Sequence, residues 1–183
     1  MDRLEEKTIS SKEIFNGKII SVRVDDVELP NGNTSKREIV KHPGAVAVLA
    51  VTDENKIVLV EQYRKAMERT MVEIPAGKLE KGEDPKECAR RELEEETGYE
   101  CKEMEWLTSF YTSPGFADEI IHLYIAKGLS QKEDAAGLDE DEFVNLEEVT
   151  LDEALQYVKE KKIYDAKTAY AILYLQLQEA LAK

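Results

Sequence analysis

The chain of 183 residues is poor in cysteine, histidine and positive charge, and it has no long hydrophobic run. Its two cysteines form no CxxC or zinc-ligand pattern, which predicts two free thiols in a reducing compartment. The first residues, MDRLEEK, contain no apolar signal segment, and no run of about 18 apolar residues follows, so we expect a cytoplasmic protein. The net charge of −14 and the lack of a basic cluster argue against non-specific binding to nucleic acid or to an anionic membrane.

The length and the order of expected elements predict one α/β domain with a small N-terminal appendage. The expected strands are residues 18–29, 34–41, 45–51, 56–64, 71–76, 104–110, 119–126 and 143–149, and the expected helices are residues 85–97, 151–161 and 166–182. The first two strands flank a turn cluster, Pro30-Asn31-Gly32-Asn33, and form a protruding β-hairpin. We therefore divide the chain into an N-terminal β-hairpin extension, residues 1–42, and a main domain, residues 43–183.

Residues 77–99, GKLEKGEDPKECARRELEEETGY, carry the most informative pattern, G-x5-E-x7-R-E-U-x-E-E-x-G-U, where U is a bulky apolar residue. Its specified positions are Gly77, Glu83, Arg91, Glu92, Glu95, Glu96 and Gly98. Seven such positions, each at a frequency of about 7%, would match a given start by accident on the order of 10⁻⁸ of the time. Asp84 as a cap, Pro85 at the first helical position and Gly98 after the end predict a helix over residues 85–97.

Three carboxylates share one face of this predicted helix, because Glu92, Glu95 and Glu96 are spaced i, i+3 and i+4. Such carboxylates repel each other, and Arg91 is one partner that can compensate. A hard divalent cation with oxygen ligands, Mg²⁺ or Mn²⁺, is the better partner, and it suits a phosphate substrate. The alternative is a solvated glutamate-rich face, but the glycine loop and Gly98 at fixed offsets disfavour it.

With this motif the chain resembles the Nudix hydrolases, and residues 77–99 are the Nudix box. One mild departure is Tyr99, where aliphatic residues are commoner. The resemblance implies an α/β/α sandwich with a mixed sheet, and hydrolysis of a nucleoside diphosphate linked to another moiety. It also implies Glu92 and Glu96 as metal ligands, with Glu95 sharing the metal, the carbonyl of Ala76 as a further ligand, and Arg91 orienting the glutamates.

Three features outside the box resemble the ADP-ribose pyrophosphatases. Pro114 lies 16 residues after Gly98, in the turn Ser113-Pro114-Gly115. Arg64 matches a phosphate-binding arginine, and the pair Arg37-Glu38 matches a substrate-contacting pair. Each has an ordinary alternative, namely a turn proline, a solvated arginine and a cross-strand pair, but together they favour ADP-ribose as substrate.

The general base in this subfamily often comes from a late acidic loop, which here offers Glu140 and Glu142. We slightly prefer Glu142, because it lies next to the strand expected from Phe143, and Glu95 is the next candidate. Glu73, before the box, is a candidate to hold metal-bound water or substrate. The sequence leaves open which aromatic residue stacks on adenine.

The resemblance further implies a homodimer with exchanged N-terminal strands, in which Arg37 and Glu38 lie near the substrate. The expected products are AMP and ribose 5-phosphate. The alternatives are a hydrolase of another nucleoside diphosphate derivative, such as an ADP-sugar or NADH, and a non-catalytic nucleotide-sensing module. A sensing module would be expected to lose box carboxylates, whereas all four motif glutamates are present.

Overall fold

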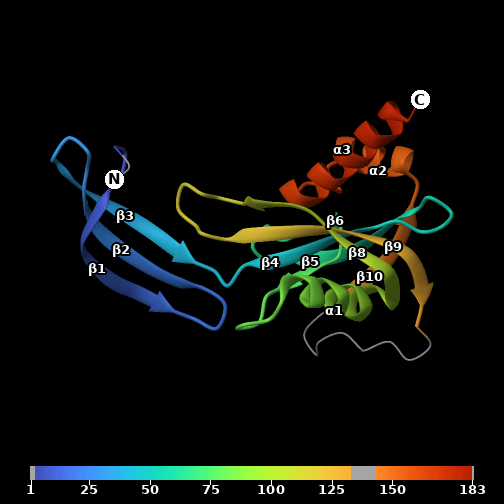
Figure 1. Ribbon diagram of the computed structural model, residues 1–183, viewed down its shortest axis with the longest axis horizontal. Coiled ribbons are helices and arrows are strands. Elements are labelled where there is room, and N and C mark those ends of the chain that lie inside the picture. The colour runs from blue at the N-terminus through green and yellow to red at the C-terminus, as the bar shows by residue number, and fades with distance from the viewer. Residues whose placement is uncertain (1–2, 133–142, 183) are drawn as a thin grey trace. The chain divides into compact units, whose positions relative to one another are not determined.

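The computed structural model describes residues 3–132 and 143–182, so Glu140 and Glu142 lie outside the described residues (Figure 1). The chain divides into two compact units. The N-terminal unit comprises Met1–Gly44 and Phe110–Ile120, and the main unit comprises Ala45–Ser109 and Ile121–Lys183. We describe each unit by itself.

The N-terminal unit contains an antiparallel sheet of three strands in the order β1-β2-β3. The strands β2 (Ser21–Glu28) and β3 (Thr34–Lys41) form the hairpin that the sequence predicts, and Gly32 closes its turn with φ 83°. The sequence did not predict β1 (Lys7–Asn16), which pairs with β2. All ten of its residues are exposed, so the alternation of buried and exposed positions that marks a strand is missing.

The main unit combines two sheets, in the orders β7-β4-β9-β8 and β10-β5-β6. Their strands are β4 (Ala45–Ala50), β5 (Ile57–Arg64), β6 (Arg69–Glu73), β7 (Ala76–Lys78), β8 (Tyr99–Tyr111), β9 (Ile120–Gln131) and β10 (Val144–Val149). The pair β4–β9 is parallel, whereas β4–β7, β5–β6 and β5–β10 are antiparallel. The predicted mixed sheet of an α/β fold is therefore confirmed.

In the part of the chain that the structure describes, the helices α1 (Pro85–Thr97), α2 (Leu151–Lys159) and α3 (Ala166–Leu181) cover these strands. In Figure 1, α1 lies on one side of the strands of the main unit, and α2 and α3 lie on the other. Leu93 of α1 is fully buried in a core shared with Val46 of β4, Val58 of β5 and Tyr124 of β9. Burial of one such leucine contributes about 2 kcal/mol, so this contact fixes the helix on the sheet.

The helix α3 buries polar residues in its first turn and apolar residues in its second turn. Its buried residues are Lys167, Thr168, Ala171 and Ile172. The side chains of Leu173, Leu177 and Leu181 are exposed instead. The first turn of α3 is therefore held in the main unit largely through a lysine and a threonine.

Candidate active site

Local signals place the helix α1 as the sequence predicts. The side chain of Asp84 accepts hydrogen bonds from the backbone N–H groups of Lys86 and Glu87, at 2.9 and 3.3 Å, and Pro85 begins the helix. Gly98 ends it in the left-handed region, with φ 71°. Because Leu93 faces the core, the motif glutamates lie on the remaining surface of the helix, and Glu92 and Glu96 are still buried there.

Arg91 holds the acidic residues of the motif together. Its Nε and Nη2 donate to the two carboxylate oxygens of Glu83, at 3.0 and 3.2 Å. Its Nη1 donates to Glu95 at 2.8 Å and lies 2.9 Å from an oxygen of Glu92. The hydrogen bonds from Arg91 lower the pKa of Glu83 to about 2. Arg91 thus pairs with Glu95 on the helix and with Glu83 in the loop before it.

The segment Ala76–Gly77 fits closely around two glutamates of α1. The backbone N–H of Ala76 donates to Glu96 Oε2 at 2.9 Å. At Gly77 a Cβ atom would lie only 1.8 Å from the carboxylate carbon of Glu92, so the carboxylate occupies the space that any side chain would need. The carbonyl of Ala76 belongs to the peptide that joins these two contact points.

This arrangement offers the donor types that suit a divalent cation. Within residues 3–132 and 143–182, no three acidic, histidine or cysteine side chains converge as a metal site. The predicted ligands Glu92 and Glu96 nevertheless lie against two consecutive residues, Gly77 and Ala76, with Glu95 one turn from Glu92 on the same helix. Carboxylate and carbonyl oxygens are the donors that Mg²⁺ and Mn²⁺ prefer.

Arg64, the predicted phosphate-binding residue, is fixed by a buried carboxylate. Its Nε and Nη2 donate to the two oxygens of Glu73, at 2.7 and 2.8 Å. Glu73 raises the pKa of Arg64, and the charge of Glu96 adds to this effect, so Arg64 lies within electrostatic reach of the box. Glu73 is 2% exposed and is also bound by Lys167. Its oxygens are thus engaged by two cations, and that Glu73 holds metal-bound water or substrate stays a prediction.

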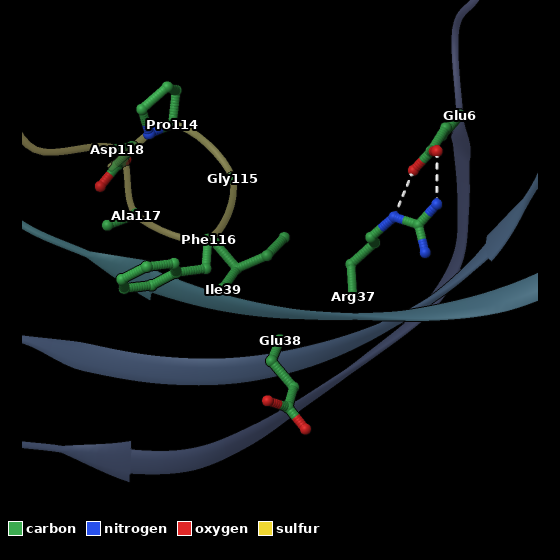
Figure 2. Close-up of a pocket in the computed structure, with 9 residues that line it drawn as sticks. All are labelled: Glu6, Arg37, Glu38, Ile39, Pro114, Gly115, Phe116, Ala117 and Asp118. Atoms are coloured by element: carbon green, nitrogen blue, oxygen red, sulfur yellow. Dashed lines mark hydrogen bonds and ion pairs between the residues drawn. The ribbon is translucent and has the colours of Figure 1, made fainter. Parts of the chain in front are cut away.

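Four of the predicted substrate residues of the N-terminal unit line one hollow of about 350 Å³, and Ser113 is not among its lining residues (Figure 2). Arg37 and Glu38 contribute from β3, and Pro114 and Gly115 contribute from the loop that follows Ser113. The carbonyl of Ser113 accepts from the N–H groups of the two residues after Gly115, at 3.1 and 2.9 Å, which closes the turn. The structure therefore brings together two motifs that lie far apart in the sequence.

Hydrogen bonds join this loop to β3. The N–H of Val40 donates to the carbonyl of Phe116 at 2.8 Å, and Asp118 N–H donates to the carbonyl of Val40 at 3.2 Å. Within the hollow, Arg37 makes two hydrogen bonds to Glu6, at 2.7 and 2.5 Å (Figure 2). Sequence reasoning missed Glu6, because it precedes a strand with no burial pattern, and no other sequence signal points to it.

Two family models match the chain. The NUDIX domain matches residues 41–170, and the nucleoside diphosphate sugar hydrolase N-terminal domain matches residues 6–40. The chain therefore belongs to the NUDIX family, and it is a hydrolase. Members of this family generally depend on divalent metal ions. No described helix is long and apolar enough to cross a membrane.

Two curated relatives resemble almost the whole chain. It is 76% identical over 177 residues to the methanol dehydrogenase activator of Bacillus methanolicus, a match that covers 97% of this chain and 96% of the relative. It is 66% identical over 181 residues to the ADP-ribose pyrophosphatase of Bacillus subtilis (strain 168), with coverage of 99% and 98%. A solved structure described as an ADP compounds hydrolase superimposes with a TM-score of 0.83 at 18% identity, covering 95% of this chain and 94% of that chain. At that identity the structural likeness supports the fold alone.

Proposed function

We propose that this enzyme hydrolyses the pyrophosphate bond of ADP-ribose to give AMP and ribose 5-phosphate. The observation that carries the proposal is the 66% identity, over 99% of the chain, to an ADP-ribose pyrophosphatase. The geometry supports it, because a helix with intact carboxylates, a fixed arginine at the end of β5 and the Arg37-Glu38 hollow are the parts that a charged nucleotide substrate requires.

In this proposal Glu92, Glu95, Glu96 and the carbonyl of Ala76 hold Mg²⁺ or Mn²⁺. When bound, the metal would lower the pKa of the attacking water and neutralise charge on the phosphates. Arg91 positions the glutamates through the contacts described above.

Further residues act on the substrate itself. Arg64 donates charge-assisted hydrogen bonds to a phosphate oxygen. In the other unit, Arg37, Glu38 and the turn Ser113-Pro114-Gly115 bind the nucleotide. A carboxylate of the acidic loop, Glu142 or else Glu140, accepts the proton of the attacking water.

One comparison of substrates tests the proposal. Turnover of ADP-ribose, ADP-glucose and NADH is measured side by side, with Mg²⁺, with Mn²⁺ and with excess chelator. We expect the highest kcat/KM with ADP-ribose and no turnover in chelator. A preference for another of these compounds would make the chain a hydrolase of a different nucleoside diphosphate derivative. Tight ADP-ribose binding without turnover of any of them would make it a sensing module.

A second candidate function rests on the relative that is 76% identical, the methanol dehydrogenase activator. Under this proposal the chain raises the activity of a methanol dehydrogenase. Adding the purified protein to the dehydrogenase of Bacillus methanolicus and following alcohol oxidation tests it. A Glu96→Gln variant in the same assay shows whether stimulation requires the hydrolytic site.

We also propose a homodimer in the cytoplasm, with residues 1–42 as the dimerisation and substrate extension. The strand β1 exposes Ile9, Ile14 and Phe15, which a second copy would cover. Removing residues 1–42 should give a monomer that binds ADP-ribose weakly. Light scattering on both proteins checks this: an active full-length monomer at micromolar concentration would exclude the dimer.

A further inference from the structure

Lys167 is a buried cation that the proposed chemistry does not use. It lies in the first turn of α3 and is 8% exposed. Its Nζ donates to Oε2 of Glu73, and to Oδ2 of Asp165 at 3.0 Å. An unpaired lysine is costly to bury, so its position is determined by these two carboxylates.

The carboxylate of Glu73 joins Lys167 to Arg64. Its Oε1 accepts from Arg64 Nε, and its Oε2 accepts both from Arg64 Nη2 and from Lys167 Nζ. Burial by itself raises the pKa of Glu73, but the hydrogen bonds and charges of Arg64 and Lys167 outweigh it and bring the pKa down to about 2. Glu73 is therefore ionised at neutral pH and shared between the two cations.

The position of Lys167 is itself fixed on both sides. The same oxygen of Asp165 that accepts from Lys167 also caps α3, by accepting from the N–H of Thr168 at 3.1 Å. The hydroxyl of Thr168 accepts from the N–H of Ile74, the residue after Glu73, at 3.1 Å. Two contacts thus join the start of α3 to the end of β6: Lys167 binds the side chain of Glu73, and Thr168 accepts from the backbone N–H of Ile74.

Arg64 keeps the capacity to bind an anion in this arrangement. A guanidinium has five N–H donors, and Glu73 accepts from two of its nitrogens. The side chain of Arg64 is 37% exposed, so its outer edge reaches solvent. Because Glu73 shares its charge with Lys167, Arg64 is not fully neutralised by its own partner.

We propose that Lys167 is a positioning residue, which acts through Glu73 to fix the plane and preserve the charge of Arg64 toward the phosphates of the substrate. The inference rests on the proposed function and deepens it. Without Lys167, the carboxylate of Glu73 has only Arg64 as a cationic partner. The guanidinium of Arg64 is then neutralised more fully and held in position less firmly, so it offers the phosphates less positive charge. Substrate binding should suffer more than the chemical step, since Arg64 contacts the phosphates before and during reaction.

The test is a double-mutant cycle on ADP-ribose hydrolysis, with Lys167→Met, Glu73→Gln, the double variant, and Lys159→Met as a matched control that removes an exposed lysine. We expect Lys167→Met to raise KM about tenfold with kcat within about threefold. Glu73→Gln should raise KM similarly, and the double variant should match Glu73→Gln alone. Lys159→Met should leave KM unchanged. Position 73 carries no charge in the double variant, so its comparison with Glu73→Gln keeps the test available if Lys167→Met fails to fold.

Three results would overturn the proposal. A lower melting temperature with an unchanged KM would make Lys167 merely structural. Effects on KM that multiply in the double variant would mean that Lys167 acts independently of Glu73. If wild-type protein hydrolyses no ADP-ribose, the proposed function fails separately, and calorimetric binding of ADP replaces KM. In that case we expect Lys167→Met to weaken ADP binding about tenfold and Lys159→Met to leave it unchanged. If Lys167→Met binds ADP as tightly as the wild type, the role of Lys167 is refuted.

Discussion

Replacing Gly77 by alanine should disable the enzyme without unfolding it. The new Cβ would lie 1.8 Å from the carboxylate carbon of Glu92 and 2.0 and 2.2 Å from its oxygens. To reach the 3.4 Å of ordinary contact, the carboxylate has to retreat by about 1.6 Å. A displacement of about 1 Å in a positioned group costs about 10²-fold in rate, so we expect kcat/KM to fall by about 10²-fold or more.

The assay is ADP-ribose turnover at saturating Mg²⁺, with a thermal melt of each protein. The control is Gly82→Ala in the same loop, where nothing lies within 4 Å of the added Cβ. Gly82 has φ +83°, so its replacement carries a backbone cost of about 1 kcal/mol and gives a destabilised protein with normal Glu92. If Gly77→Ala keeps kcat/KM within threefold of wild type, the close contact with Glu92 has no part in catalysis and the proposed ligand set must be revised.

The remaining predictions concern single carboxylates. Glu96→Gln should lower kcat by about 10²-fold or more with little change in melting temperature, because the amide oxygen can still accept from the N–H of Ala76 while the charge is lost. Glu142→Gln, or else Glu140→Gln, should lower kcat more than tenfold; if neither does, the base lies in the box. Glu73 has a folded pKa of about 2 against 4.5, so its contribution to stability is fully present above pH 4.5 and is lost as the pH falls toward 2. Urea unfolding between pH 2.5 and 6 should therefore show that the free energy of unfolding of Glu73→Gln falls less steeply with falling pH than that of the wild type. The same pH dependence in both proteins would contradict the ion pairs of Glu73.

The part of the site that depends on local sequence was predictable. The bounds of α1 match the expectation because Asp84, Pro85 and Gly98 act within one turn of the helix ends. The strand β8 (Tyr99–Tyr111) is longer than the predicted residues 104–110, because pairing within its sheet, and not its own composition, sets its length.

The contacts between distant segments were not predictable. Arg91 pairs with Glu83 in the loop, which spacing along a helix does not reveal. The ion pair of Lys167 with Glu73 joins residues 94 positions apart, and neither residue carries a sequence signal for the other. Glu6 contacts Arg37 because it directly precedes β1, a strand that the sequence did not predict and that pairs with β2.

The contact between Lys167 and Glu73 also bears on when the enzyme becomes competent during synthesis. Every residue of the Nudix box has left the ribosome well before residue 167 is added, and domains fold from the N-terminus as the chain emerges. The nascent chain can then form α1 and its glutamates while Glu73 has only Arg64 as partner. A contact that spans 94 residues is completed late, because the loop must close first. Arg64 therefore reaches its final set of contacts only when α3 docks, and unfinished chains carry the box without the completed pairing of Arg64, Glu73 and Lys167.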